Sequence, residues 1–128
     1  MKNSNKAKVM IVDDEVCIRE MLKDILEGNG YLVTTEGNGL EALQKLKNEH
    51  FDTIISDIDM PGCSGFELLK KAKIIDSNAN IIIMTASSNE SYCCQSMYLG
   101  ASGFFHKPFD IQQLLSNIEC SIADKNRR

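Results

Sequence analysis

The sequence predicts an α/β domain in which parallel strands form one doubly wound sheet with helices on both faces. Short apolar runs of strand length alternate with longer segments of helical spacing, and the alternation occurs five times along the chain. The run Ile81-Ile82-Ile83-Met84 is apolar throughout, which is typical of a strand covered on both faces. Strands that are each followed by a helix favour parallel pairing through right-handed crossovers.

In the first half of the chain the apolar pattern predicts three strands and two helices. The first helix shows the clearest helical period, between Ile18 and Leu26, and is expected to end at Gly28-Asn29-Gly30. The elements predicted here are a strand at 9–12, this helix, a strand at 31–35, a helix from 40 to about 49, and a strand that begins at 53.

The second half of the chain is expected to supply two more strands and three more helices. They are a helix around 66–72, a strand at 81–84, a helix at about 89–99, a strand at 103–105 and a helix at 111–122. Asp110 stands where it would cap the last of these helices. The helix at 89–99 has a poor apolar stripe, with Tyr92, Met97 and Tyr98 among polar residues, which suits a mobile element that binds a partner.

Right-handed crossovers then predict the flavodoxin-like strand order 2-1-3-4-5, with five helices. The pattern contains no internal repeat and fits one domain over residues 8–124. A short polar lead at 1–7 precedes this domain, and residues 125–128 are expected to form a tail or the start of a linker.

Composition restricts the classes of function. The formal net charge is −4 and the pI is near 5.1, which disfavours direct contact with nucleic acid. No apolar run approaches the length of a membrane span, and the first residues lack the apolar core of a signal peptide, so a cytoplasmic location without membrane contact is expected. The 5 cysteines show no CxxC spacing and are expected to be reduced thiols.

Charged and polar residues follow four of the predicted strands. Asp13-Asp14 follows the first strand, Asp57 the third, Thr85 the fourth and Lys107 the fifth. Each has an ordinary explanation alone: Asp14 as a helix cap, a strand-end Asp or Thr as turn chemistry, and Lys107 as surface charge. Because the carboxyl ends of parallel strands meet at one edge, the combination predicts a binding site there.

The carboxylates at this edge indicate a metal. Two of them about 5 Å apart repel by about 3 kcal/mol at an effective dielectric constant near 20, so three need a cation or a proton. Mg²⁺ prefers hard oxygen ligands and often bridges carboxylates to a phosphate, with Mn²⁺ as the alternative ion. A carboxylate can also attack phosphorus to give an aspartyl phosphate, whose oxygens a lysine and a hydroxyl would bind.

Five short motifs, taken together, resemble the receiver domain of bacterial response regulators. They occur in the family's order over about residues 7–124, and they are Val12-Asp13-Asp14-Glu15, Ser56-Asp57-Ile58-Asp59-Met60-Pro61-Gly62, Met84-Thr85-Ala86, Gly100-Ala101 and Lys107-Pro108-Phe109. The resemblance implies that Asp57 accepts a phosphoryl group from a histidine of a partner kinase or a histidine phosphotransfer protein.

The resemblance also implies the roles of the surrounding residues. The metal would be held by Asp13, Asp14, Asp57 and the backbone carbonyl of Asp59. Thr85 and Lys107 would bind the phosphoryl oxygens, beside the small Ala86, and the Lys107–Pro108 peptide bond would be cis. Phosphorylation would then move Thr85 inward and let the aromatic Phe104 rotate, changing the surface of the fourth helix, fifth strand and fifth helix for a downstream protein, a fused output domain or a second copy.

Three positions bear on how this switch would work in detail. Phe104 stands where many members have tyrosine, so a large rotation is not assumed. The charge of Asp59 stands at a position that tunes the phosphoryl lifetime, with a sign that the sequence leaves open. Ser87 is small and leaves access for water, so autodephosphorylation is expected not to be strongly hindered. The protein is expected to be a signalling switch and not an enzyme acting on other substrates.

Three other functions are weighed against this one. A receiver that never takes phosphate would act as a docking module with the same fold. A haloacid-dehalogenase-like phosphohydrolase would use Asp57-Ile58-Asp59, but the acidic pair would then follow the lysine instead of preceding it. A flavodoxin-type electron carrier would need a phosphate-binding loop where this chain has Asp13-Asp14-Glu15, whose charges would repel the phosphate.

Overall fold

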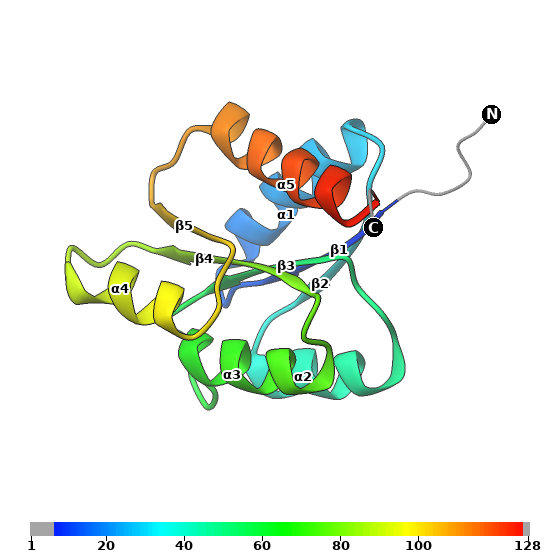
Figure 1. Cartoon of the computed structure of the whole chain (residues 1–128). Helices are drawn as coiled ribbons and strands as arrows, with labels where there is room; N and C mark the ends of the chain where they lie inside the picture. The colour runs from blue at the N-terminus through cyan, green and yellow to red at the C-terminus, as the bar shows by residue number, and fades with distance from the viewer. Residues whose placement is uncertain (1–6, 127–128) are drawn as a thin grey trace.

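A computed structural model describes residues 7–126 and confirms the predicted fold class. Five parallel strands form one sheet in the order β2-β1-β3-β4-β5, and a helix follows each strand (Figure 1). The strands are β1 (Lys8–Val12), β2 (Leu32–Glu36), β3 (Thr53–Asp57), β4 (Asn80–Thr85) and β5 (Gly103–His106). The helices are α1 (Val16–Gly28), α2 (Gly39–Asn48), α3 (Gly65–Ile75), α4 (Ser91–Tyr98) and α5 (Ile111–Asn126).

The sheet separates two apolar cores. Helices α1 and α5 cover one face, while α2, α3 and α4 cover the other (Figure 1). Successive residues of β1 alternate between these cores, with Met10 and Val12 packed toward α2 and α3, and Val9 and Ile11 packed toward α1 and α5. All of them are fully buried, which explains why the central strands are apolar on both faces.

Polar side chains fix several helix starts. Asn38 accepts a hydrogen bond from the N–H of Glu41 at the start of α2, and Ser64 accepts one from Glu67 at the start of α3. The predicted cap of α5 is present, since Asp110 Oδ1 accepts from the N–H of Gln112 at 2.8 Å. These caps place the loops that lead from the sheet edge into the helices.

The predicted end segments are only partly described. Of the lead at 1–7, residues 1–6 lie outside the described residues. The predicted boundary at 124 falls inside α5, which continues to Asn126, and 127–128 again lie outside the described part. No helix among the described residues has both the length and the apolar character needed to cross a bilayer.

Helix α4 is the least anchored helix whose burial is described along its full length. Its one buried residue is Ser96, while Met97 and Tyr98 are exposed. The ring of Tyr92 packs edge-on against Phe66 of α3, with ring centroids 5.3 Å apart, and supplies an apolar contact that the poor stripe did not reveal. Because α4 buries so little side-chain surface, moving it away from the rest of the domain costs little free energy.

Candidate functional site

The ends of β1, β3 and β5 bring two carboxylates and one ammonium group together. Lys107 Nζ lies 2.8 Å from Asp13 Oδ2 and 3.5 Å from Asp57 Oδ2. Asp13 is completely buried and Asp57 nearly so. A third carboxylate, that of Glu15, reaches to 3.8 Å from the same ammonium. Lys107 therefore neutralises part of the charge of two buried carboxylates, those of Asp13 and Asp57.

The cluster fits a divalent cation. One carboxylate oxygen from each of Asp13, Asp14 and Asp57 lies within 4.8 Å of the other two. Asp14 is exposed, so the cluster is open to solvent on one side, and its side chain does not cap α1, whose N-cap residue is Glu15. Three hard oxygen donors at an open edge suit Mg²⁺ or Mn²⁺, which keep several bound waters.

The pKa of Asp57 is raised from 3.8 to about 6, chiefly because the carboxyl is buried. The charge of Asp13 contributes to this rise, whereas Lys107 and the N–H of Asp59, 3.4 Å from Asp57 Oδ1, act to lower the pKa. For Lys107, burial lowers the pKa, but the hydrogen bond to Asp13 and the nearby carboxylates outweigh burial, so the net direction is upward. The lysine is thus held cationic beside a carboxylate that has lost much of its hydration.

The end of β4 adds a hydroxyl to this edge. Thr85 is fully buried, and its Oγ1 accepts a hydrogen bond from the N–H of Ser87 at 2.9 Å. Its carbonyl accepts from the N–H of Lys107 at 2.7 Å, which ties the backbone of Thr85 to the lysine-bearing loop. Ala86 is exposed next to it, and Phe104 of β5 is half-buried against the core beneath α2, α3 and α4.

The Lys107–Pro108 peptide bond is cis. It follows directly after β5, so the lysine is the first residue beyond the sheet on that strand. The side chain then turns back across the sheet edge to Asp13, 94 residues earlier in the sequence.

Sequence reasoning missed a glycine that packs against the backbone of Asp57. A Cβ on Gly65, the first residue of α3, would lie 2.4 Å from the carbonyl oxygen of Asp57 and 2.7 Å from Cα of Ile58. Its N–H donates to the carbonyl of Ile58 at 2.9 Å. Only a residue without a side chain lets α3 begin so close to the end of β3. The signal available in the sequence was a glycine directly after the capping Ser64.

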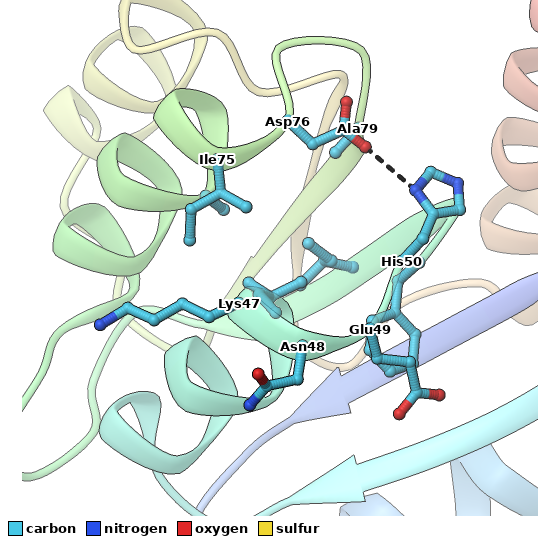
Figure 2. Close-up of a pocket in the computed structure, with 11 residues that line it drawn as sticks. Lys47, Asn48, Glu49, His50, Ile75, Asp76 and Ala79 are labelled. Atoms are coloured by element: carbon cyan, nitrogen blue, oxygen red, sulfur yellow. Dashed lines mark ion pairs between the residues drawn. The ribbon is translucent and has the colours of Figure 1, made fainter.

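A hollow lies at the edge of the sheet opposite the acidic cluster, between the C-terminal ends of α2 and α3 (Figure 2). Its volume is about 450 Å³, and His50 spans its rim to reach Asp76 at 3.3 Å. The apolar side chains beneath it, such as Phe51 and Ile54, are already buried in the core. It has no cluster of carboxylates like that of the acidic edge, so it is not the candidate site.

Fold and site together define a class: a parallel α/β domain that presents a lysine and an acidic cluster fit for a divalent cation at the carboxyl edge of its sheet. Residues 9–119 match the family model of the response regulator receiver domain. The chain therefore belongs to the response regulator receiver family of two-component systems, as its motifs indicated. The haloacid-dehalogenase and flavodoxin interpretations, which required other families, are set aside.

Two curated relatives span nearly the same length as this chain. Sporulation initiation phosphotransferase F of Bacillus subtilis is 40% identical over 107 residues, covering 84% of this chain and 86% of that protein. Chemotaxis protein CheY of the same organism is 38% identical over 112 residues, covering 87% and 93%. Among solved structures, the response regulator TrrA of Thermotoga maritima in complex with Mg²⁺-BeF is 35% identical, with a TM-score of 0.82 over 90% of this chain and 98% of that one.

Proposed function

We propose that this protein is a phosphorylation switch in which Asp57 receives a phosphoryl group in a Mg²⁺-dependent reaction. The observation that carries the proposal is the convergence of Asp57 with a buried carboxylate, an exposed carboxylate and Lys107 at one edge of the sheet. The name of one relative, a phosphotransferase, and the Mg²⁺-BeF complex of another support the same chemistry.

In this reaction a carboxylate oxygen of Asp57 attacks the phosphorus of a phosphohistidine. The new O–P bond forms as the N–P bond to the histidine breaks, and the imidazole leaves with that electron pair. Mg²⁺, when bound, would neutralise charge on the transferring group, with Asp13, Asp14, Asp57 and the backbone carbonyl of Asp59 as its protein ligands. The raised pKa of Asp57 keeps part of it protonated near pH 6, so transfer favours higher pH.

The phosphorylated state would then redistribute two polar contacts. Lys107 would exchange part of its contact with Asp13 for a phosphoryl oxygen, and the hydroxyl of Thr85 would bind another beside the small Ala86. Since Phe104 lacks a hydroxyl, its buried and exposed positions differ only in packing. Together these shifts would alter the surface formed by α4, β5 and α5.

Receivers of this family exchange signals with histidine kinases and pass them to output domains. We infer that a histidine kinase or histidine phosphotransfer protein in the cytoplasm donates to this chain. The altered surface would bind a downstream protein or a fused output domain, and a homodimer that forms on phosphorylation is the alternative. Ser87 leaves access for water, which supports autodephosphorylation that is not strongly hindered. Asp59 is exposed two residues from Asp57, where its charge would tune the phosphoryl lifetime in either direction.

The test is the intact mass of the protein after incubation with acetyl phosphate and Mg²⁺. We expect a labile gain of one phosphoryl group that is absent in Asp57→Asn and absent when EDTA replaces the metal. Asp59→Asn, which changes an exposed acid two residues away, should retain the gain. No gain in the wild type under any of these conditions would favour the alternative, a docking receiver that works without phosphate.

A further inference from the structure

Arg19 of α1 makes an unusual contact for an arginine at an acid-rich edge. Its Nη1 donates to the backbone carbonyl of Asp13 at 2.6 Å, and the side chain is half-buried. None of the ion pairs found among residues 7–126 includes Arg19. The guanidinium therefore holds the main chain of a metal-site residue instead of pairing with a carboxylate.

The contact completes a set of four that immobilise Asp13. Its N–H donates to the carbonyl of Glu36 at 3.2 Å, and its carboxylate accepts from the N–H of Glu15 at 2.9 Å and from Lys107 at 2.8 Å. Of these, the bond from Arg19 is the one that fixes the carbonyl. Without this bond the carbonyl of the peptide unit between Asp13 and Asp14 would lose its contact with Arg19. The two carboxylate side chains are attached at the two ends of this unit, so its orientation affects both.

The guanidinium also rests on the loop that follows β2. A Cβ on Gly37 would lie 3.2 Å from Nη1 and 3.7 Å from Cζ of Arg19, and its three nearest atoms all belong to that guanidinium. The φ angle of Gly37 is not in the left-handed region, so alanine there strains only this contact. Arg19 thus joins α1, the end of β1 and the loop after β2 at a single point.

We propose that Arg19 is a positioning residue for metal binding, which sets the carboxylates of Asp13 and Asp14 through their shared peptide unit. The inference rests on the proposed function, because it requires that the acidic cluster binds Mg²⁺. Removing partners of metal ligands typically costs 10–100-fold in metal affinity. If Arg19 acted only as a positive charge that repels the cation, removing it would strengthen metal binding instead. The sign of the change in affinity therefore distinguishes a positioning role from a purely electrostatic one.

The experiment is calorimetric titration of the full chain with MgCl₂ for the wild type, Arg19→Gln, Gly37→Ala and two controls. We expect Arg19→Gln to weaken Mg²⁺ binding about 10-fold or more. Gly37→Ala keeps the charge and displaces only the guanidinium, so it should weaken binding in the same direction by a smaller factor. Lys23→Gln removes one charge from the same helix without touching Asp13, and Gly28→Ala adds a Cβ with nothing within 4 Å; both should bind like the wild type.

Thermal unfolding in EDTA and in Mg²⁺ separates positioning from general stability. A purely structural role would lower both midpoints equally, whereas a positioning role shrinks the rise that Mg²⁺ produces. The inference is overturned if Arg19→Gln binds Mg²⁺ as tightly as the wild type or more tightly, or if Gly37→Ala leaves the affinity unchanged. A wild type that binds no Mg²⁺ would instead overturn the proposed function, and this inference with it.

Discussion

At the scale of single residues, the sequence predicted where the carboxylates, the hydroxyl and the lysine of the site would lie. It did not predict which residues hold them in place. Asp13, Asp57, Thr85 and Lys107 follow apolar strands, and parallel pairing brings strand ends to one edge whatever the details of packing. The roles of Arg19 and Gly65 were not predicted, because they consist of contacts that exist only in the folded chain. A lone arginine or glycine in a sequence carries no sign of which backbone group it will meet.

The acceptor itself should make stability depend on pH. The pKa of Asp57 is about 6 in the folded state against 3.8 ordinarily, so between these pH values the native state binds more protons than the unfolded state. The free energy of unfolding should therefore fall as the pH rises from about 4 to about 6, by on the order of 2–3 kcal/mol from this residue. Below that window the carboxyl is protonated in both states and contributes nothing.

Asp57→Asn removes the free-energy cost of ionising a buried carboxyl. In EDTA the variant should therefore be more stable than the wild type above pH 6 and similar to it near pH 4. Urea unfolding across this pH range measures the difference, and Asp59→Asn serves as the control because its carboxylate is exposed. A gap between wild type and variant that stays constant with pH would rule out this assignment of the raised pKa.

At the scale of elements, the apolar periods predicted all ten strands and helices in order. Most ends moved by a residue or two, and the C-terminal ends of α3 and α5 moved further, to Ile75 and Asn126. Helix α4 was expected from about 89 to 99 but spans Ser91–Tyr98, because Asn89 and Glu90 belong to the turn before it. Strand β5 extends one residue further than predicted, to His106, since pairing with Thr85 of β4 continues there. Such ends depend on pairing partners that lie far away in the sequence.

The start of α3 should tolerate no side chain at its first residue. Gly65→Ala places a Cβ against the backbone of Asp57, which ends β3, and of Ile58, which follows it. Either α3 or this backbone must therefore shift, at a cost of about 1–3 kcal/mol. Chemical denaturation measures the loss, with Gly28→Ala as a control whose Cβ meets nothing within 4 Å. Wild-type stability in Gly65→Ala would show that this close approach is not required.

Helix α4 should open more readily than its neighbours. It buries only Ser96, whereas α3 buries Gly65, Leu68, Leu69 and Ala72. Amide hydrogen exchange should therefore be faster in α4 than in α3, because local opening exposes less apolar surface. Equal protection of the two helices would contradict the view that α4 is loosely anchored and free to respond to the site.

At the scale of the whole molecule, the proposed metal binding would compete with proton binding at the same cluster. Mg²⁺ needs the ionised form of Asp57, so its affinity should increase as the pH rises through about 6. The midpoint of thermal unfolding should rise on adding Mg²⁺, more at pH 7.5 than at pH 5, and Asp57→Asn should lose most of this rise. A rise that is the same at both pH values would place the metal elsewhere.

The central claim is that Asp57 carries the phosphoryl group, and borohydride reduction tests it most directly. An acyl phosphate is reduced by borohydride to an alcohol, so phospho-Asp57 becomes homoserine, which peptide mass spectrometry locates. After incubation with acetyl phosphate and Mg²⁺, we predict homoserine at position 57 and at no other aspartate, with none formed in EDTA. Reduction at Asp13, Asp14 or Asp59 instead, or at no aspartate in a sample whose mass has increased, would contradict the account.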